Sequence, residues 1–133
     1  MARAGDDALA RLLLELGYLC LREGRFAEAE TLLRGAGALR PREVAPGLCL
    51  GMVRFAQGGY AEAEQRYREV LAEHPDDDLV RAFLGEALIA QRRWVDARQT
   101  LEPVARAGRH PAAAAFAGEL LGQLDRGLFQ RSV

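Results

Sequence analysis

The chain has 133 residues, of which 50% are hydrophobic and 28% charged, and its 14 glycines and 5 prolines form no long tracts. A chain of this length and composition can bury one continuous core without disulfides or a metal, so a disordered chain is excluded and a single domain is expected. The formal net charge is −1 and no segment concentrates one sign, which argues against a nucleic-acid partner.

The N-terminal residues and the cysteines indicate a cellular compartment. Asp6 and Asp7 lie where a signal peptide needs its apolar segment, and no apolar run approaches the length of a membrane span. We therefore expect a soluble, cytoplasmic protein with no membrane insertion. Cys20 and Cys49 each fall in an apolar stripe of a predicted helix, which favours reduced thiols that pack in the core over a disulfide.

Helical patterns follow one another along the chain in pairs. Each pair is divided by a short breaker, at 23–25, 57–59 and 91–93, and prolines at 41 and 75 end the second helices of the first two pairs. The pattern predicts helical hairpins over about 10–43, 44–77 and 78–111.

An alanine-rich segment over about 112–125 follows Pro111. Phe116, Leu120, Leu121 and Leu124 share one side of it at helical spacing. We expect this segment to cap the open apolar face of the last hairpin. Docking of the segment into a second copy of the chain is the alternative.

Four columns of residues recur at a constant step of 34 residues. The columns are Leu16-Gly17, Leu50-Gly51 and Leu84-Gly85; Phe26, Tyr60 and Trp94; Ala29, Ala63 and Ala97; and Leu33, Tyr67 and Leu101. Glycine and alanine recur because small residues let paired helices approach closely.

This pattern of Leu-Gly, Gly-x-Tyr/Phe-x-x-Ala, a large apolar residue and Pro resembles the tetratricopeptide repeat (TPR) over about residues 10–111. The resemblance implies an all-α fold in which three TPR hairpins and a C-terminal capping helix, about seven helices, form a right-handed superhelix over a single domain, 1–133. The third copy departs from the pattern, because Arg92 replaces the turn glycine and Pro111 is displaced by two residues.

The first helix of repeat one, predicted over 9–21, is apolar nearly all round, which predicts burial on more than one side. The repeat columns assign one stripe of it to packing against the second helix of the pair: Leu13, Leu16, Gly17 and Cys20.

A second stripe of the same helix, at i, i+4 and i+7, recurs at the 34-residue step. In TPR proteins these positions line a concave groove, so the resemblance implies a partner-binding groove that accepts an amphipathic helix or an apolar peptide. The predicted groove residues are Leu14, Tyr18, Leu21, Leu48, Met52, Phe55, Leu79, Ala82, Glu86 and Ile89. Tyr18 and Phe55 are the expected anchors, because aromatic residues dominate interface energetics. The alternative is that these side chains are core.

Residues that could support catalysis or bind a metal are few and scattered. His74 and His110 fall in predicted turns, without a cysteine or carboxylate partner at metal-ligand spacing. The acidic run 76–78 lacks the glycine and distal glutamate of a calcium loop and lies where a helix begins, so we interpret it as a helix cap. We expect no enzyme activity, no cofactor, and no catalytic, cofactor-binding or metal-binding residue.

Short three-repeat TPR chains with an apolar groove resemble the small cytoplasmic TPR chaperones of bacterial type III secretion, the YscY and YscG kind. The resemblance implies that the chain holds an apolar or amphipathic helix of an export substrate or needle component until export. A homodimer in the absence of the partner is a further expectation. The alternative is a general TPR scaffold or self-associating adaptor in another bacterial pathway.

Overall fold

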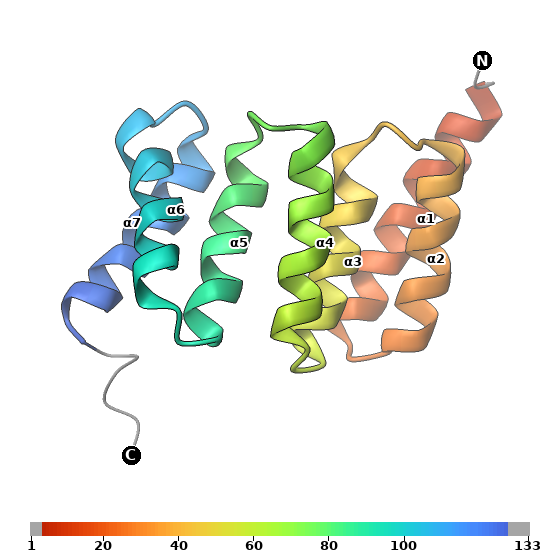
Figure 1. Cartoon of the computed structure of the whole chain (residues 1–133). Helices are drawn as coiled ribbons and strands as arrows, with labels where there is room; N and C mark the ends of the chain where they lie inside the picture. The colour runs from red at the N-terminus through yellow and green to blue at the C-terminus, as the bar shows by residue number, and fades with distance from the viewer. Residues whose placement is uncertain (1–3, 128–133) are drawn as a thin grey trace. The chain divides into compact units, whose positions relative to one another are not determined.

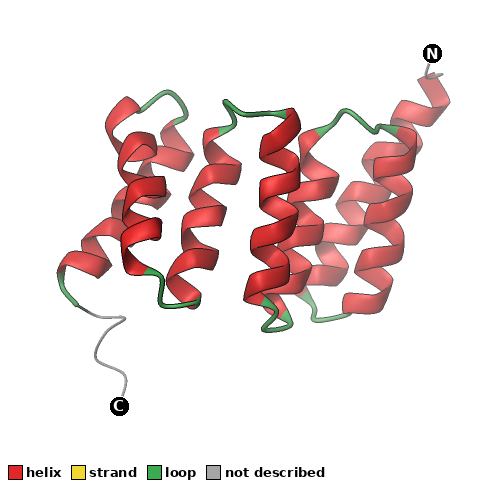
Figure 2. Ribbon diagram, in the orientation of Figure 1, coloured by secondary structure: helices red, strands yellow, loops and turns green. Residues whose placement is uncertain are grey.

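The computed structural model describes residues 4–127, and throughout that range the chain forms helices and turns without a strand (Figure 1, Figure 2). The seven helices of this range are α1 (Ala4–Arg22), α2 (Phe26–Leu39), α3 (Val44–Ala56), α4 (Tyr60–Glu73), α5 (Asp78–Ala90), α6 (Trp94–Ala107) and α7 (Pro111–Asp125). The predicted all-α class with about seven helices is confirmed.

The chain divides into two compact units, Met1–Arg66 and Tyr67–Val133, and the boundary between them lies inside α4. Unit 1 contains α1, α2, α3 and the start of α4, whereas unit 2 contains the rest of α4 with α5, α6 and α7. Each repeat predicted from the sequence holds two of the helices. The organisation of the three repeats as one domain stays a prediction.

The glycines of the Leu-Gly pairs allow the first and third hairpins to close. A Cβ atom added at Gly17 of α1 would lie 2.8 Å from Cδ2 of Leu33, and one at Gly85 of α5 would lie 2.3 Å from Cδ2 of Leu101. Both distances are shorter than the roughly 3.5 Å at which carbon atoms attract each other. Leu33 and Leu101 are fully buried. The leucine of the second helix therefore occupies the space that a side chain at the glycine would need.

The core of unit 1 contains one of the two cysteines. The buried cluster joins α1, α2 and α3 and consists of Leu21, Ala29, Leu33, Cys49 and Val53. Cys20 is half-buried and packs against this cluster, and both thiols are free. Burial raises the pKa of the Cys49 thiol to about 11. Both cysteines thus pack in or against the core, as predicted.

The turns inside the three hairpins share one backbone conformation. Gly24 and Gly58 have φ angles of +76° and +83°. Arg92, which occupies the same position in the third hairpin, has a φ of +60°. The backbone nitrogen of Arg92 donates to the carbonyl oxygen of Ile89 at 2.8 Å, as that of Gly24 does to Leu21 at 3.0 Å. The third hairpin thus keeps the turn of the other two, with an arginine in the left-handed region that glycine adopts more easily.

The expectation that α1 is buried on more than one side is wrong. Four of its leucines are largely exposed, at 46% for Leu9, 50% for Leu12, 40% for Leu16 and 51% for Leu19. Leu16 therefore does not belong to the stripe that packs against α2. The equivalent Leu50 of α3 packs against the buried cluster of unit 1. No helix precedes α1 among the described residues, so this side of α1 lacks the neighbour that the preceding pair provides for α3.

The last helix, α7, packs against both α6 and α5 in unit 2. Ala113, Ala117, Leu120 and Leu124 form its buried face. The ring of Phe116 meets that of Phe83 on α5 edge to face, with centroids 5.2 Å apart, and Phe83 in turn lies 6.1 Å from the buried ring of Tyr67. The alanine-rich segment is thus a helix that covers apolar surface of unit 2.

Candidate partner-binding surface

Six of the predicted groove residues lie on α1 and α3, which pack against each other in unit 1. Two of the six, Leu21 and Leu48, are buried and add little surface. The accessible residues are Tyr18, which is 42% exposed, and the half-buried Leu14, Met52 and Phe55. Leu14 and Met52 also contact the buried cluster of unit 1. We call these four residues the tyrosine stripe.

Phe55 has an internal partner that the sequence did not reveal. Its ring meets the ring of Tyr60, the first residue of α4, edge to face with centroids 4.9 Å apart. Such a pair contributes about 0.5–1.5 kcal/mol beyond the burial of its area. Phe55 therefore stabilises the fold and also forms part of the surface, whereas Tyr18 is more exposed.

The other four predicted groove residues lie on α5 in unit 2. Ala82 and Ile89 are buried, and Leu79 and Glu86 are half-buried. Glu86 forms no hydrogen bond or ion pair with another described residue, and its partial burial raises the pKa of its carboxyl group above the usual range. Glu86 is thus a partly desolvated acceptor within an apolar stretch.

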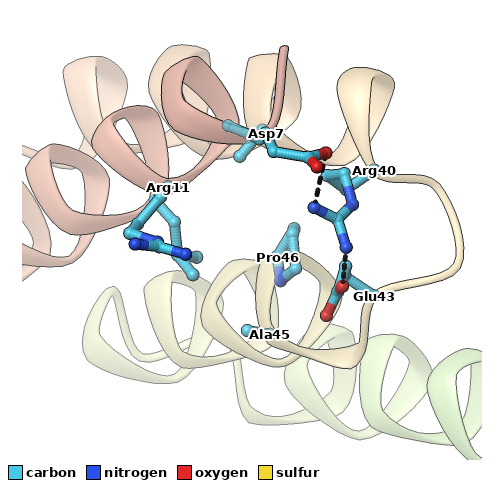
Figure 3. Close-up of a pocket in the computed structure, with 9 residues that line it drawn as sticks. Asp7, Arg11, Arg40, Glu43, Ala45 and Pro46 are labelled. Carbon is cyan, nitrogen blue, oxygen red and sulfur yellow. Dashed lines mark hydrogen bonds and ion pairs between the residues drawn. The ribbon is translucent and has the colours of Figure 1, made fainter. Parts of the chain in front are cut away.

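A pocket of about 260 Å³ lies in unit 1, where the start of α1, the end of α2 and the start of α3 meet (Figure 3). Arg40 closes one side, because its guanidinium donates to Asp7 at 2.7 Å and to Glu43 at 2.5 Å. Arg11 lines another side of the pocket and forms no ion pair with a described residue. Apolar side chains complete the wall: Ala10, Leu14, Ala36, Ala45 and Pro46. The volume of the pocket is below the roughly 300–1,000 Å³ of small-molecule and cofactor sites.

His110 and Asp77, two of the residues singled out in the sequence, cap helices. Nδ1 of His110 accepts a hydrogen bond from the backbone nitrogen of Ala113 at 3.1 Å and caps α7. Asp77 caps α5 by accepting from the backbone nitrogen of Val80 at 3.0 Å. The interpretation of this acidic run as a helix cap is confirmed at Asp77. No cluster of three metal-ligating side chains occurs within residues 4–127.

Asp78 has a role that the sequence analysis missed. Its side chain is buried and accepts from Nε and Nη2 of Arg109 at 3.1 and 2.8 Å, and from Arg81 at 3.2 Å. The hydrogen bonds from Arg109 are the main reason that the pKa of this carboxyl lies below its usual range. The pair joins the start of α5 to the turn before α7. Its residues are 31 positions apart rather than 34, so the repeat columns do not reveal it.

A second ion-pair network joins the helices of unit 1. Glu30 of α2 accepts from Arg34 and, across the helix boundary, from Arg54 of α3 at 2.7 Å. The hydrogen bond from Arg34 is the largest influence that lowers the pKa of Glu30. Arg54 stands in the last turn of α3 and donates to this carboxylate, so it contributes to the packing of α3 on α2.

A family model for the tetratricopeptide repeat matches residues 54–120, half of the chain. The chain belongs to the TPR family. TPR domains are scaffolds for protein–protein interaction, so this TPR protein is a protein-interaction module. No curated protein matches the chain. The matched residues run from the end of α3 through most of α7, so they include the third hairpin with its arginine turn.

No helix of the TPR protein within the described range is both long enough and apolar enough to cross a bilayer. α1, the longest at 19 residues, carries Asp6, Asp7, Arg11 and Glu15 in its first three turns.

Proposed function

We propose that this TPR protein binds an apolar or amphipathic helix of a protein partner through the tyrosine stripe of unit 1. The observation that carries the proposal is the exposed ring of Tyr18 on the same face of α1 as the half-buried Leu14, together with the half-buried Met52 and Phe55 on α3, which packs against α1. Exposed aromatic residues next to apolar surface are the usual anchors of protein interfaces. Met52 supports the proposal, because its flexible thioether adapts to different partner side chains.

In unit 2 we propose a further partner contact at Leu79 and Glu86. The carboxylate of Glu86 is available to accept a hydrogen bond from a basic or polar group of the partner. Full burial of each large apolar side chain contributes roughly 1.5–3 kcal/mol before the costs of ordering and association. Because Leu14, Met52 and Phe55 are already half-buried, each of them contributes less than this amount, and Tyr18, the most exposed of the four, contributes most.

The biological role that we propose is that of a cytoplasmic chaperone in bacterial protein secretion. It holds the helix of an export substrate or needle component until export, binds without catalysis, and forms a homodimer when the partner is absent. The support for this role is the small size of the chain, its three helix pairs and its TPR family membership. The mechanism is physical: the partner helix is covered, so it cannot associate with other copies of itself.

The test compares wild type with Tyr18→Glu in pull-downs from native lysate, with retained proteins identified by mass spectrometry. Val95→Glu in α6 is the matched control, because Val95 is 70% exposed and lies outside the proposed surface. We expect a small secretion protein to be retained by wild type and Val95→Glu and lost with Tyr18→Glu, at unchanged helix content. Identical retention by all three proteins would rule out the tyrosine stripe as the binding site.

The alternative is a TPR scaffold or self-associating adaptor in another bacterial pathway. A second apolar stripe on α1, formed by exposed leucines, favours self-association. Co-expression separates the two roles, because a chaperone's partner becomes insoluble without this protein, whereas a scaffold's partner stays soluble.

A further inference from the structure

The exposed leucines of α1 lie on one face of the helix. Leu9, Leu12, Leu16 and Leu19 follow the 3- and 4-residue steps that keep side chains on one side of an α-helix. We call this set the leucine stripe. The described residues include seven exposed large hydrophobic side chains, and four of them are in this stripe. A concentration of that kind marks an interaction site rather than scattered surface leucines.

The spacing of the leucine stripe is the same in both directions along the helix. The steps are 3, 4 and 3, so the pattern is symmetric about the level of residue 14. An antiparallel copy of α1 therefore places Leu9 opposite Leu19 of the second copy and Leu12 opposite Leu16. Every leucine meets a leucine, which is the self-complementarity that a two-fold interface requires.

The charges on α1 select the antiparallel direction. Asp6 and Asp7 lie in the first turn of the helix and Arg22 in the last. An antiparallel pair brings the acidic end of each helix to the basic end of the other, and also opposes the two helix dipoles. A parallel pair would place like charges side by side.

We propose that two copies of the chain associate through the leucine stripe as an antiparallel α1–α1 pair. At 1.5 Å per residue, the stripe extends over about 15 Å of the helix. Tyr18 is on another side of α1, so this association leaves the tyrosine stripe open. The inference therefore goes beyond the proposed function and does not rest on it.

The test is sedimentation velocity of the full chain over a concentration series. Wild type is expected to sediment as a dimer. Leu12→Glu and Leu16→Arg should each weaken self-association by at least about 10-fold, because a change in a two-fold interface occurs twice and each 1.4 kcal/mol is a factor of ten. Both positions are about half exposed, so circular dichroism should show unchanged helix content. Val95→Glu, on α6, should remain dimeric.

The double variant Leu12→Glu/Leu16→Arg tests the direction of pairing. In the antiparallel pair each glutamate faces an arginine of the second copy, so the double variant should recover at least part of the dimer that the single variants lose. In a parallel pair glutamate would face glutamate, and no recovery would occur. A monomeric wild type at every concentration, or a dimer that both single variants leave intact, would overturn the proposal.

Discussion

The turn at Arg92 allows a direct test of how the third hairpin is built. Arg92 adopts a φ of +60° at the position where the other two hairpins have glycine. A residue with a Cβ atom pays about 1–2 kcal/mol for the left-handed conformation. We therefore predict that Arg92→Gly is more stable than Arg92→Ala, although glycine is the residue that loses most backbone entropy on folding.

The size of the effect follows from these two terms. The greater freedom of glycine in the unfolded chain costs about 0.4–1 kcal/mol, which offsets part of the relief at the turn. We expect glycine to be more stable than alanine at position 92 by about 1 kcal/mol. Alanine is the proper reference, because Arg92 has interactions of its own that both variants remove. At Gly58, where a Cβ atom would meet nothing within 4 Å, alanine should cost a similar amount.

The measurement is urea unfolding followed by far-UV circular dichroism, with the free energy of unfolding compared among Arg92→Gly, Arg92→Ala and Gly58→Ala. Equal stability of the two variants at position 92, or a more stable alanine variant, would show that the turn relaxes out of the left-handed region. The argument from the backbone angle would then be wrong.

Two further predictions concern unit 2. Asp78→Asn should lower the free energy of unfolding by about 1–2 kcal/mol at neutral pH. Because the pKa of Asp78 is lowered in the folded protein, its contribution is present above the unfolded pKa of about 3.9 and is lost as pH falls through the folded value. Urea unfolding at a series of pH values should therefore show the two proteins converging in acid, and a constant difference would contradict the role of Arg109. Gly85→Ala should destabilise by about 1–3 kcal/mol, because the new methyl group overlaps Leu101, whereas Gly118→Ala, in open space on α7, should gain up to about 1 kcal/mol of helix propensity. Thermal unfolding of both variants checks this pair, and a tolerated Gly85→Ala would mean that Leu101 can move aside.

The repeating part of the fold could be predicted because its packing is local and periodic. Gly17 and Leu33 contact each other within one hairpin, and the same pair recurs two steps of 34 residues along the chain as Gly85 and Leu101. A contact that depends only on position within a repeat places similar residue types at the same position of every copy. The helices, the hairpin turns and the packing role of the small residues were therefore readable in the sequence.

The features that sequence missed depend on where a residue lies in the array. Leu16 and Leu50 occupy the same column, yet Leu16 is exposed and Leu50 packs against the core, because among the described residues a helix pair precedes α3 but not α1. The burial of Ala82 and Ile89 was missed for a related reason: a stripe that is apolar in every copy reads equally well as groove or as core. The ion pair between Asp78 and Arg109 occurs in one copy only, so no column signals it.

Cys49 gives the folded state a built-in chemical reporter. Alkylating reagents react with the thiolate, which is the nucleophile. The Cys49 thiol is covered by the core of unit 1 and, with a pKa of about 11, is protonated at neutral pH. Cys20 is only half-buried and reacts through smaller movements of the chain. The ratio of the alkylation rates of Cys20 and Cys49 therefore distinguishes local fluctuations of α1 from global unfolding of the core, without any added probe.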